Sequence, residues 1–154
     1  MIKYTTQTEK EYNKSDVLEL IEKLDRHFVP PLSSRVNLEE YANKLDKFAS
    51  MILAFSESGK LIGMIAFYNN NQSDKIAYIT YLGVLPAFQG NGIANYLLKD
   101  CISKCKDKGM NFILVETWEN NENVIHLYKK KGFKLVNKVA DRNNTKSIKL
   151  ELEL

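Results

Sequence analysis

Apolar residues at helical spacing dominate the first third of the chain. A weakly alternating segment, residues 2–6, predicts a short first strand. A helix is expected from Ser15, its N-cap, to the residues before Pro30. Its apolar face comprises Val17, Leu18, Ile21, Leu24 and Phe28. Asn37 with Glu40 forms a capping-box pattern that starts a second helix, whose apolar face comprises Leu38, Tyr41, Leu45 and Phe48.

The pattern changes at residue 51, where apolar runs rich in β-forming residues begin. Residues 51–55, 61–68 and 76–84 are three such runs, separated by short polar turns. Short turns join neighbouring antiparallel strands, so these runs predict a three-stranded meander.

A helix with a single apolar stripe is expected after residue 92, and Gly109 ends it. Residues 112–115 are nearly all apolar, which is typical of a strand buried on both faces. Because a helix separates this strand from the run 76–84, the two should lie parallel. A short helix then opens within 119–123 and closes at Gly132. Residues 133–136 and 147–154 supply the last two strands.

Composition fits one domain over residues 1–154. The 154 residues can bury a sizeable core, and 44% hydrophobic with 27% charged residues is ordinary for a soluble globular protein. The net charge of +3 is spread among acidic residues, which argues against a nucleic-acid partner. The one basic run, Lys129 to Lys131, closes a helix, where positive charge complements the helix dipole.

The start of the chain lacks the apolar core of a signal peptide, and no apolar run approaches the length of a membrane span. We therefore expect a cytoplasmic protein without a membrane partner. Cys101 and Cys105 lie one turn apart on a predicted helix stripe, which indicates reduced core residues rather than a disulfide or a metal site.

Candidate chemistry begins where the run 76–84 enters a glycine-bearing turn and the following helix. Such a turn points free backbone N–H groups and the positive end of the helix dipole at one place, which favours an anion. Gly90 and Gly92 let the backbone approach a phosphate, and Ala94 keeps the first helical turn slim. The turn has neither the Gly-Lys-Ser/Thr of a P-loop nor the third glycine of a dinucleotide-binding turn.

Gln89-x-x-Gly92-x-Ala94 resembles the Gln/Arg-x-x-Gly-x-Gly/Ala signature of the GCN5-related N-acetyltransferase (GNAT) family. A second block, Asn121-x-x-x-Ile125-x-Leu127-Tyr128-x-x-x-Gly132-Phe133, resembles the family's motif after its fifth strand, with Val124 where many relatives carry alanine. The expected element order, β-α-α-β-β-β-α-β-α-β-β, is also that of the family. The resemblance thus covers nearly the whole chain.

This resemblance implies an α/β fold with a mixed, mostly antiparallel sheet of roughly seven strands flanked by about four helices. It also implies acetyl-CoA as cosubstrate, no metal, and acetyl transfer to a primary amine by direct attack in a ternary complex. Whether the chain pairs with a second copy stays open. Asn121 is expected to bind the pantetheine arm or to cap its helix. The other implied cofactor contacts are Leu82, Gly83, Val84, Gln89, Gly90, Asn91, Gly92, Ile93, Ala94 and Asn95.

The reaction needs a base, because an amine with a pKa of roughly 10 is mostly protonated at neutral pH. Glu116 lies near the end of the strand segment 112–117, which extends the apolar run 112–115, and some relatives place a catalytic base there. A solvent-facing glutamate is the alternative, and Glu119 is the second candidate for the base. Tyr128 stands at the family's usual general-acid position, beside the leaving thiolate, or else packs as a core aromatic.

The resemblance places the acceptor against the connector between the first two helices. Its prolines limit the backbone freedom of the connector, and its polar side chains suit a small hydroxylated or anionic amine. The residues proposed to bind substrate are His27, Ser34 and Arg35, together with Ser33. A plain structural bridge is the alternative for the connector. For the protein as a whole, a protein Nα- or lysine acetyltransferase, a non-catalytic acyl-CoA-binding module and a nucleotide-binding module remain open.

Overall fold

The computed structural model describes residues 1–9, 12–140 and 146–154. Across them, one seven-stranded sheet has the order β1-β2-β3-β4-β5-β7-β6. The elements in chain order are β1 (Lys3–Thr6), α1 (Lys14–Asp25), η1 (Leu32–Ser34), α2 (Leu38–Phe48), β2 (Ser50–Phe55), β3 (Leu61–Tyr68), β4 (Ile76–Val84), η2 (Pro86–Phe88), α3 (Ile93–Asp107), β5 (Phe112–Trp118), α4 (Glu122–Lys130), β6 (Lys134–Ala140) and β7 (Lys146–Glu153).

This order confirms the predicted one, and the β4–β5 pair is parallel while the other neighbouring pairs are antiparallel. Both ends of α1 differ from prediction, and β6 extends to Ala140, beyond the predicted 133–136. The N-cap of α1 is Asn13, whose side chain accepts a hydrogen bond of 3.0 Å from the backbone N–H of Ser15. Helix α1 also ends earlier than predicted, at Asp25, so that Phe28 lies in the turn that follows.

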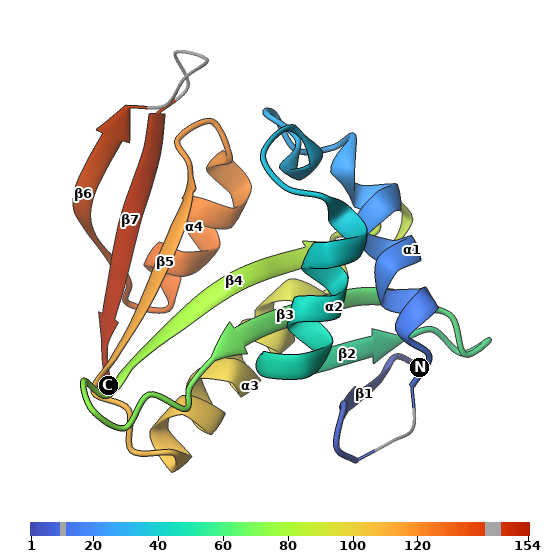
Figure 1. Ribbon diagram of the computed structural model, residues 1–154, viewed down its shortest axis with the longest axis horizontal. Helices are drawn as coiled ribbons and strands as arrows, with labels where there is room; N and C mark the ends of the chain where they lie inside the picture. The colour runs from blue at the N-terminus through green and yellow to red at the C-terminus, as the bar shows by residue number, and fades with distance from the viewer. Residues whose placement is uncertain (10–11, 141–145) are drawn as a thin grey trace.

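Helices cover both faces of the central strands. Figure 1 shows α1 and α2 in front of β2, β3 and β4, with α3 behind them. Strands β2 and β3 are therefore buried along nearly their whole length, and Phe67 is fully buried. Among the described residues, no helix is long and apolar enough to cross a membrane.

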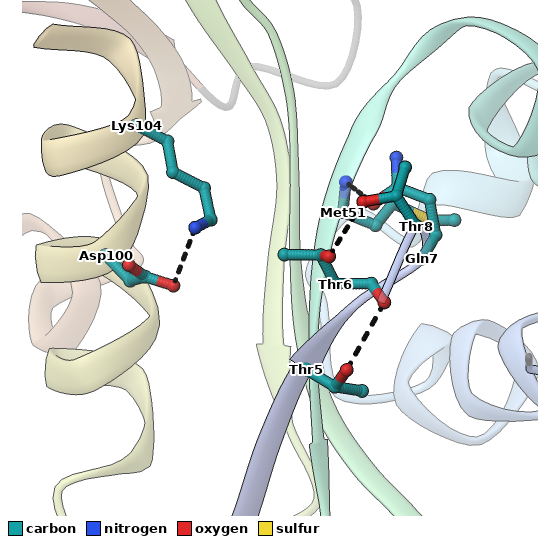
Figure 2. A network of polar contacts seen from close by, with 7 residues as sticks. All are labelled: Thr5, Thr6, Gln7, Thr8, Met51, Asp100 and Lys104. Carbon is teal, nitrogen blue, oxygen red and sulfur yellow. Dashed lines mark hydrogen bonds and ion pairs between the residues drawn. The ribbon is translucent and has the colours of Figure 1, made fainter. Parts of the chain in front are cut away.

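The side chain of Gln7 continues the hydrogen bonding between β1 and β2 past the last residue pair of the two strands. Gln7 accepts a hydrogen bond of 2.8 Å from the backbone N–H of Met51 (Figure 2) and donates one of 2.9 Å to the carbonyl of Ala49. The amide of Gln7 thus imitates one more residue pair between β1 and β2.

Strands β4 and β5 pair over only part of their length. The parallel pairing runs from Ile76 with Phe112 to Ile79 with Val115, after which the strands diverge (Figure 1). A bulge in β4 falls at the same place, because Ile79 and Tyr81 face consecutive residues of β3 and Thr80 is the extra residue. The hydroxyl of Tyr41 on α2 lies 3.0 Å from the carbonyl oxygen and 2.8 Å from the hydroxyl of Thr80. These contacts hold the bulge where the sheet opens.

Candidate functional site

The turn before α3 presents an uncapped helix start. Gly90 and Gly92 have φ of 82° and 76°, a left-handed conformation that glycine adopts without steric cost. Gly92 is the N-cap of α3 and offers no side chain to the helix N–H groups. Within the described ranges of the chain, no atom lies within 4 Å of the position that a Cβ would take at either glycine, so the space in front of the turn is open. The arrangement suits an anion held by backbone N–H groups.

Two side chains of the turn shape it from within. Gln89 donates from Nε2 to the carbonyl of Val84 at 3.1 Å, and Asn91 donates from Nδ2 to the carbonyl of Phe88 at 3.0 Å. Both amides are therefore engaged by their own turn. We expect Gln89 and Asn91 to act by fixing the backbone that faces the ligand.

Helix α4 forms the opposite wall of the groove in front of the turn. This groove, of about 280 Å³, is lined on one side by the glycine turn and on the other by Asn123, His126, Leu127 and Lys130. Lys130 was assigned from sequence only to the helix dipole, but it lies on the wall that faces the anion-binding turn. Lys130 is one helical turn from His126 and two from Asn123, so the sequence could have indicated that the three residues share one face of the helix.

A second cavity, of about 320 Å³, lies where β4 and β5 diverge. It brings together residues that sequence analysis assigned to three different roles. They are Leu82, Glu116, Asn121, Tyr128 and Arg35. The splayed strands are thus the meeting point of the predicted cofactor, catalytic and acceptor residues.

Glu116 is exposed in this cavity and is held by a neighbouring strand. Its Oε1 accepts a hydrogen bond of 2.9 Å from the hydroxyl of Ser147 on β7. Tyr78 lines the same cavity, and its pKa is raised by burial and by the negative charge of Glu116. Glu119 does not line it but borders a separate groove with Ile148. The geometry therefore favours Glu116 over Glu119 as a base that acts in the cavity.

Tyr128 combines deep burial with a place on the cavity wall. Its side chain is 2% exposed and its ring lies 5.2 Å from that of Phe133, between centroids. Burial raises the pKa of its phenol above the ordinary value, so the hydroxyl keeps its proton at neutral pH. A protonated phenol next to the cavity can serve as a proton donor.

Asn121 occupies the N-cap position of α4 without capping it through its side chain. Its Nδ2 instead donates to Thr117 Oγ1 at 3.2 Å, and the residue lines the cavity. The helix-cap interpretation of Asn121 is therefore wrong for its side chain, whose carboxamide is turned toward β5.

The connector between α1 and α2 contributes Arg35 to the cavity but not the other predicted polar residues. The guanidinium carbon of Arg35 lies 4.9 Å from the ring centre of Trp118. Ser34 donates its hydroxyl to the carbonyl of Pro31 at 2.6 Å, and His27 is exposed beside Arg26. Neither Ser34 nor His27 is part of the lining.

The cavity is partly aromatic, a feature that the sequence motifs did not predict. Its wall contains Phe28, Tyr41, Tyr78, Tyr81 and Trp118. Tyr78 and Trp118 were within recognised strand segments, so their side of the sheet could have been inferred from alternation. Tyr81 lies beyond the bulge at Thr80, where simple alternation fails.

Comparison with known proteins agrees with this architecture. The model of a family described as the acetyltransferase (GNAT) family matches residues 16–133. A chain of the NatC complex, determined with Gag peptide and CoA, is similar with a TM-score of 0.80 and 23% identity, over 99% of this chain and 98% of that one. The ribosomal-protein-S18-alanine N-acetyltransferase from Escherichia coli gives 0.79 and 15%, over 99% and 94%. YncA from Salmonella typhimurium, determined with acetyl-CoA, gives 0.74 and 17%, over 98% and 94%.

Proposed function

The chain belongs to the acetyltransferase (GNAT) family, and from this membership we propose that it transfers the acetyl group of acetyl-CoA to a primary amine held between the α1–α2 connector and the diverging strands. The observation that carries the proposal is the single cavity shared by Glu116, Tyr128 and Arg35 where β4 and β5 separate. One wall offers proton-transfer groups and the other offers contacts for an acceptor.

The residues of the glycine turn fit the phosphates of acetyl-CoA. The open space in front of Gly90 and Gly92 admits a bulky anion, and the uncapped start of α3 supplies N–H donors from Ile93, Ala94 and Asn95. Lys130 adds a positive charge across the groove. The backbone of Leu82, Gly83 and Val84 has no β5 partner and is proposed to contact the pantetheine arm, with Asn121 on the opposite side.

When bound, acetyl-CoA supplies the acetyl thioester. Glu116 accepts a proton from the acceptor nitrogen, since only the neutral amine attacks a carbonyl carbon. Ser147 keeps the carboxylate of Glu116 turned toward the cavity. Tyr128 holds its proton on Oη and donates it where the thiolate sulfur leaves. The burial of Tyr128 keeps most of its side chain out of bulk solvent.

We propose a small amine as the acceptor, with a polar end that meets Arg35 and an apolar body that meets the aromatic wall. The earlier prediction of a small polar amine depended on four connector residues, of which only Arg35 lines the cavity. A protein N-terminus is the second candidate. It is favoured by the exposed apolar side chain of Val36 in the cavity lining, which is 39% exposed.

The test is a screen of acceptors with acetyl-CoA that monitors release of free thiol. It should include amino sugars, amino acids, arylalkylamines and peptides with free N-termini. Turnover with any small amine above every peptide supports the proposal. Coenzyme A binding without thiol release would instead indicate a non-catalytic acyl-CoA-binding module. Thermal protection by ATP but not by coenzyme A would indicate a nucleotide-binding module.

A further inference from the structure

The acceptor cavity carries two opposite charges that do not neutralise each other. Among the lining residues that the structure describes, Arg35 is the one cation and Glu116 the one anion. Within the described part of the chain, neither side chain takes part in an ion pair. Both nevertheless act on Tyr78, whose pKa is raised first by burial and then by Glu116, and is lowered by Arg35. Both charges therefore border one cavity, Arg35 from the α1–α2 connector and Glu116 from β5.

The guanidinium of Arg35 is held in place by a contact that does not use its hydrogen-bond donors. Arg35 lies over the face of Trp118, at 4.9 Å from the ring centre, a contact that orients a guanidinium while leaving its in-plane N–H donors available. The cap of η1 places the Arg35 backbone, since its N–H donates to the carbonyl of Leu32 at 3.0 Å. A planar donor fork fixed in this way matches a carboxylate.

The rest of the wall is suited to an apolar body of modest size. Phe28, Tyr41 and Tyr81 contribute ring surface, and the phenol of Tyr41 is already engaged by Thr80. A second contact ties the connector to the end of β5, because Asn120 donates from Nδ2 to the carbonyl of Val29 at 3.1 Å. The volume of about 320 Å³ is at the small end of ligand pockets.

We propose that the acceptor is a free α-amino acid with an aromatic or large aliphatic side chain, whose carboxylate binds Arg35 and whose amino group meets Glu116. This inference rests on the proposed acetyltransferase function and names the substrate class of the same cavity. An α-amino acid carries one positive and one negative group, and the cavity offers one charge of each opposite sign in Glu116 and Arg35. Arg35 is then a specificity-determining residue, and the aromatic wall selects the side chain.

The experiment compares four acceptors that share one side chain: phenylalanine, phenylalaninamide, phenethylamine and the peptide Phe-Gly-Gly. Each is assayed with saturating acetyl-CoA by thiol release, and calorimetry measures phenylalanine binding in the presence of coenzyme A. We expect phenylalanine to have the highest kcat/KM. Arg35→Ala should lower the ratio of kcat/KM for phenylalanine over phenethylamine by about 10- to 100-fold, as expected for loss of a hydrogen-bonded charge.

Two further variants test whether the effect depends on the planar guanidinium of Arg35. Arg35→Lys keeps the charge but not the planar fork, so it should restore only part of the ratio. Arg26→Ala removes a neighbouring arginine that does not line the cavity, and it should leave the ratio unchanged. Calorimetric affinity for phenylalanine should fall in Arg35→Ala and not in Arg26→Ala.

The outcomes distinguish a failure of the amino-acid inference from a failure of the proposed acetyltransferase function. If phenethylamine, phenylalaninamide or Phe-Gly-Gly is acetylated as well as or better than phenylalanine, the amino-acid inference is overturned and the acetyltransferase proposal stands. An unchanged ratio in Arg35→Ala would overturn it in the same way. If no amine in this set or in the wider screen releases thiol, the proposed function itself fails.

Discussion

The hydroxyl of Ser147 donates a hydrogen bond of 2.9 Å to Oε1 of Glu116. The two residues lie on neighbouring antiparallel strands, where Glu116 faces Lys149 and Ser147 is its diagonal neighbour on the same face. The side chain of Glu116 is exposed at the cavity, so this bond limits how far its carboxylate can swing away. The last strand along the chain, β7, thereby takes part in positioning the proposed base.

Replacement of Glu116 by Gln should lower kcat by about 10² or more, the loss expected when general-base catalysis is removed. The KM for acetyl-CoA should change little, because Glu116 does not line the groove at the glycine turn. Ser147→Ala keeps the carboxylate and should cost less. Glu119→Gln is the matched control, since Glu119 lies in a separate groove. A larger loss in Glu119→Gln than in Glu116→Gln would transfer the role of base to Glu119.

Tyr128→Phe should lower kcat by about 10² with little change in acetyl-CoA affinity, because it removes a proton donor while preserving the packing against Phe133. Steady-state kinetics on the folded variant measure the effect. Burial holds the pKa of the Tyr128 phenol above its ordinary value, so ionisation of Tyr128 should not limit the rate at mildly alkaline pH. Undiminished kcat in Tyr128→Phe would leave Tyr128 as a packing residue only.

Lys130→Ala should weaken acetyl-CoA binding by several-fold, because Lys130 faces the anion-binding turn across the groove. Lys129→Ala is matched in charge and helix position, but Lys129 lies on the wall of a different groove. Calorimetry at low and high salt separates the two. The difference between the variants should shrink as salt increases, and equal affinities at low salt would contradict the assignment.

The fold could be predicted from the sequence because its signals are local. The parallel pairing of β4 with β5 followed from the apolar run 112–115 and its crossover helix, and the structure confirms it. The positive φ of Gly92 suits the turn in which the pattern placed it. Such features depend on neighbouring residues along the chain.

The site was harder to predict because its geometry depends on contacts between distant segments. The bulge at Thr80 is held by Tyr41 on α2. Strands β2 and β3 separate Tyr41 from Thr80 in the sequence. Ser34 was proposed to bind substrate from its polarity, but its hydroxyl bonds to the connector's own backbone. Residue type alone does not tell which polar side chains stay available.

Stability should fall at alkaline pH in a way that depends on Tyr41. Burial raises the pKa of Tyr41 to about 12, whereas an unfolded tyrosine has a pKa of about 10. The folded state holds its proton more tightly, so the stabilisation is fully present below about pH 10 and is lost as pH rises toward 12. Urea unfolding of wild type and Tyr41→Phe at pH 8 and 10.5 tests this. The decline should be smaller in the variant, and parallel declines would contradict it.

Tyr81→Phe should keep or raise the stability of the protein, in contrast to Tyr41→Phe. Among the described residues, the Tyr81 hydroxyl is the buried side-chain oxygen without a hydrogen-bond partner, and the residue is only 6% exposed. An unpaired buried hydroxyl costs about 1–3 kcal/mol, so its removal without change of ring shape relieves that cost. Tyr41→Phe instead breaks the contacts with Thr80 and should lower the free energy of unfolding by about 1 kcal/mol. Urea unfolding of both variants at neutral pH compares them directly. A loss of more than about 1 kcal/mol in Tyr81→Phe would mean that the hydroxyl has a partner in solution.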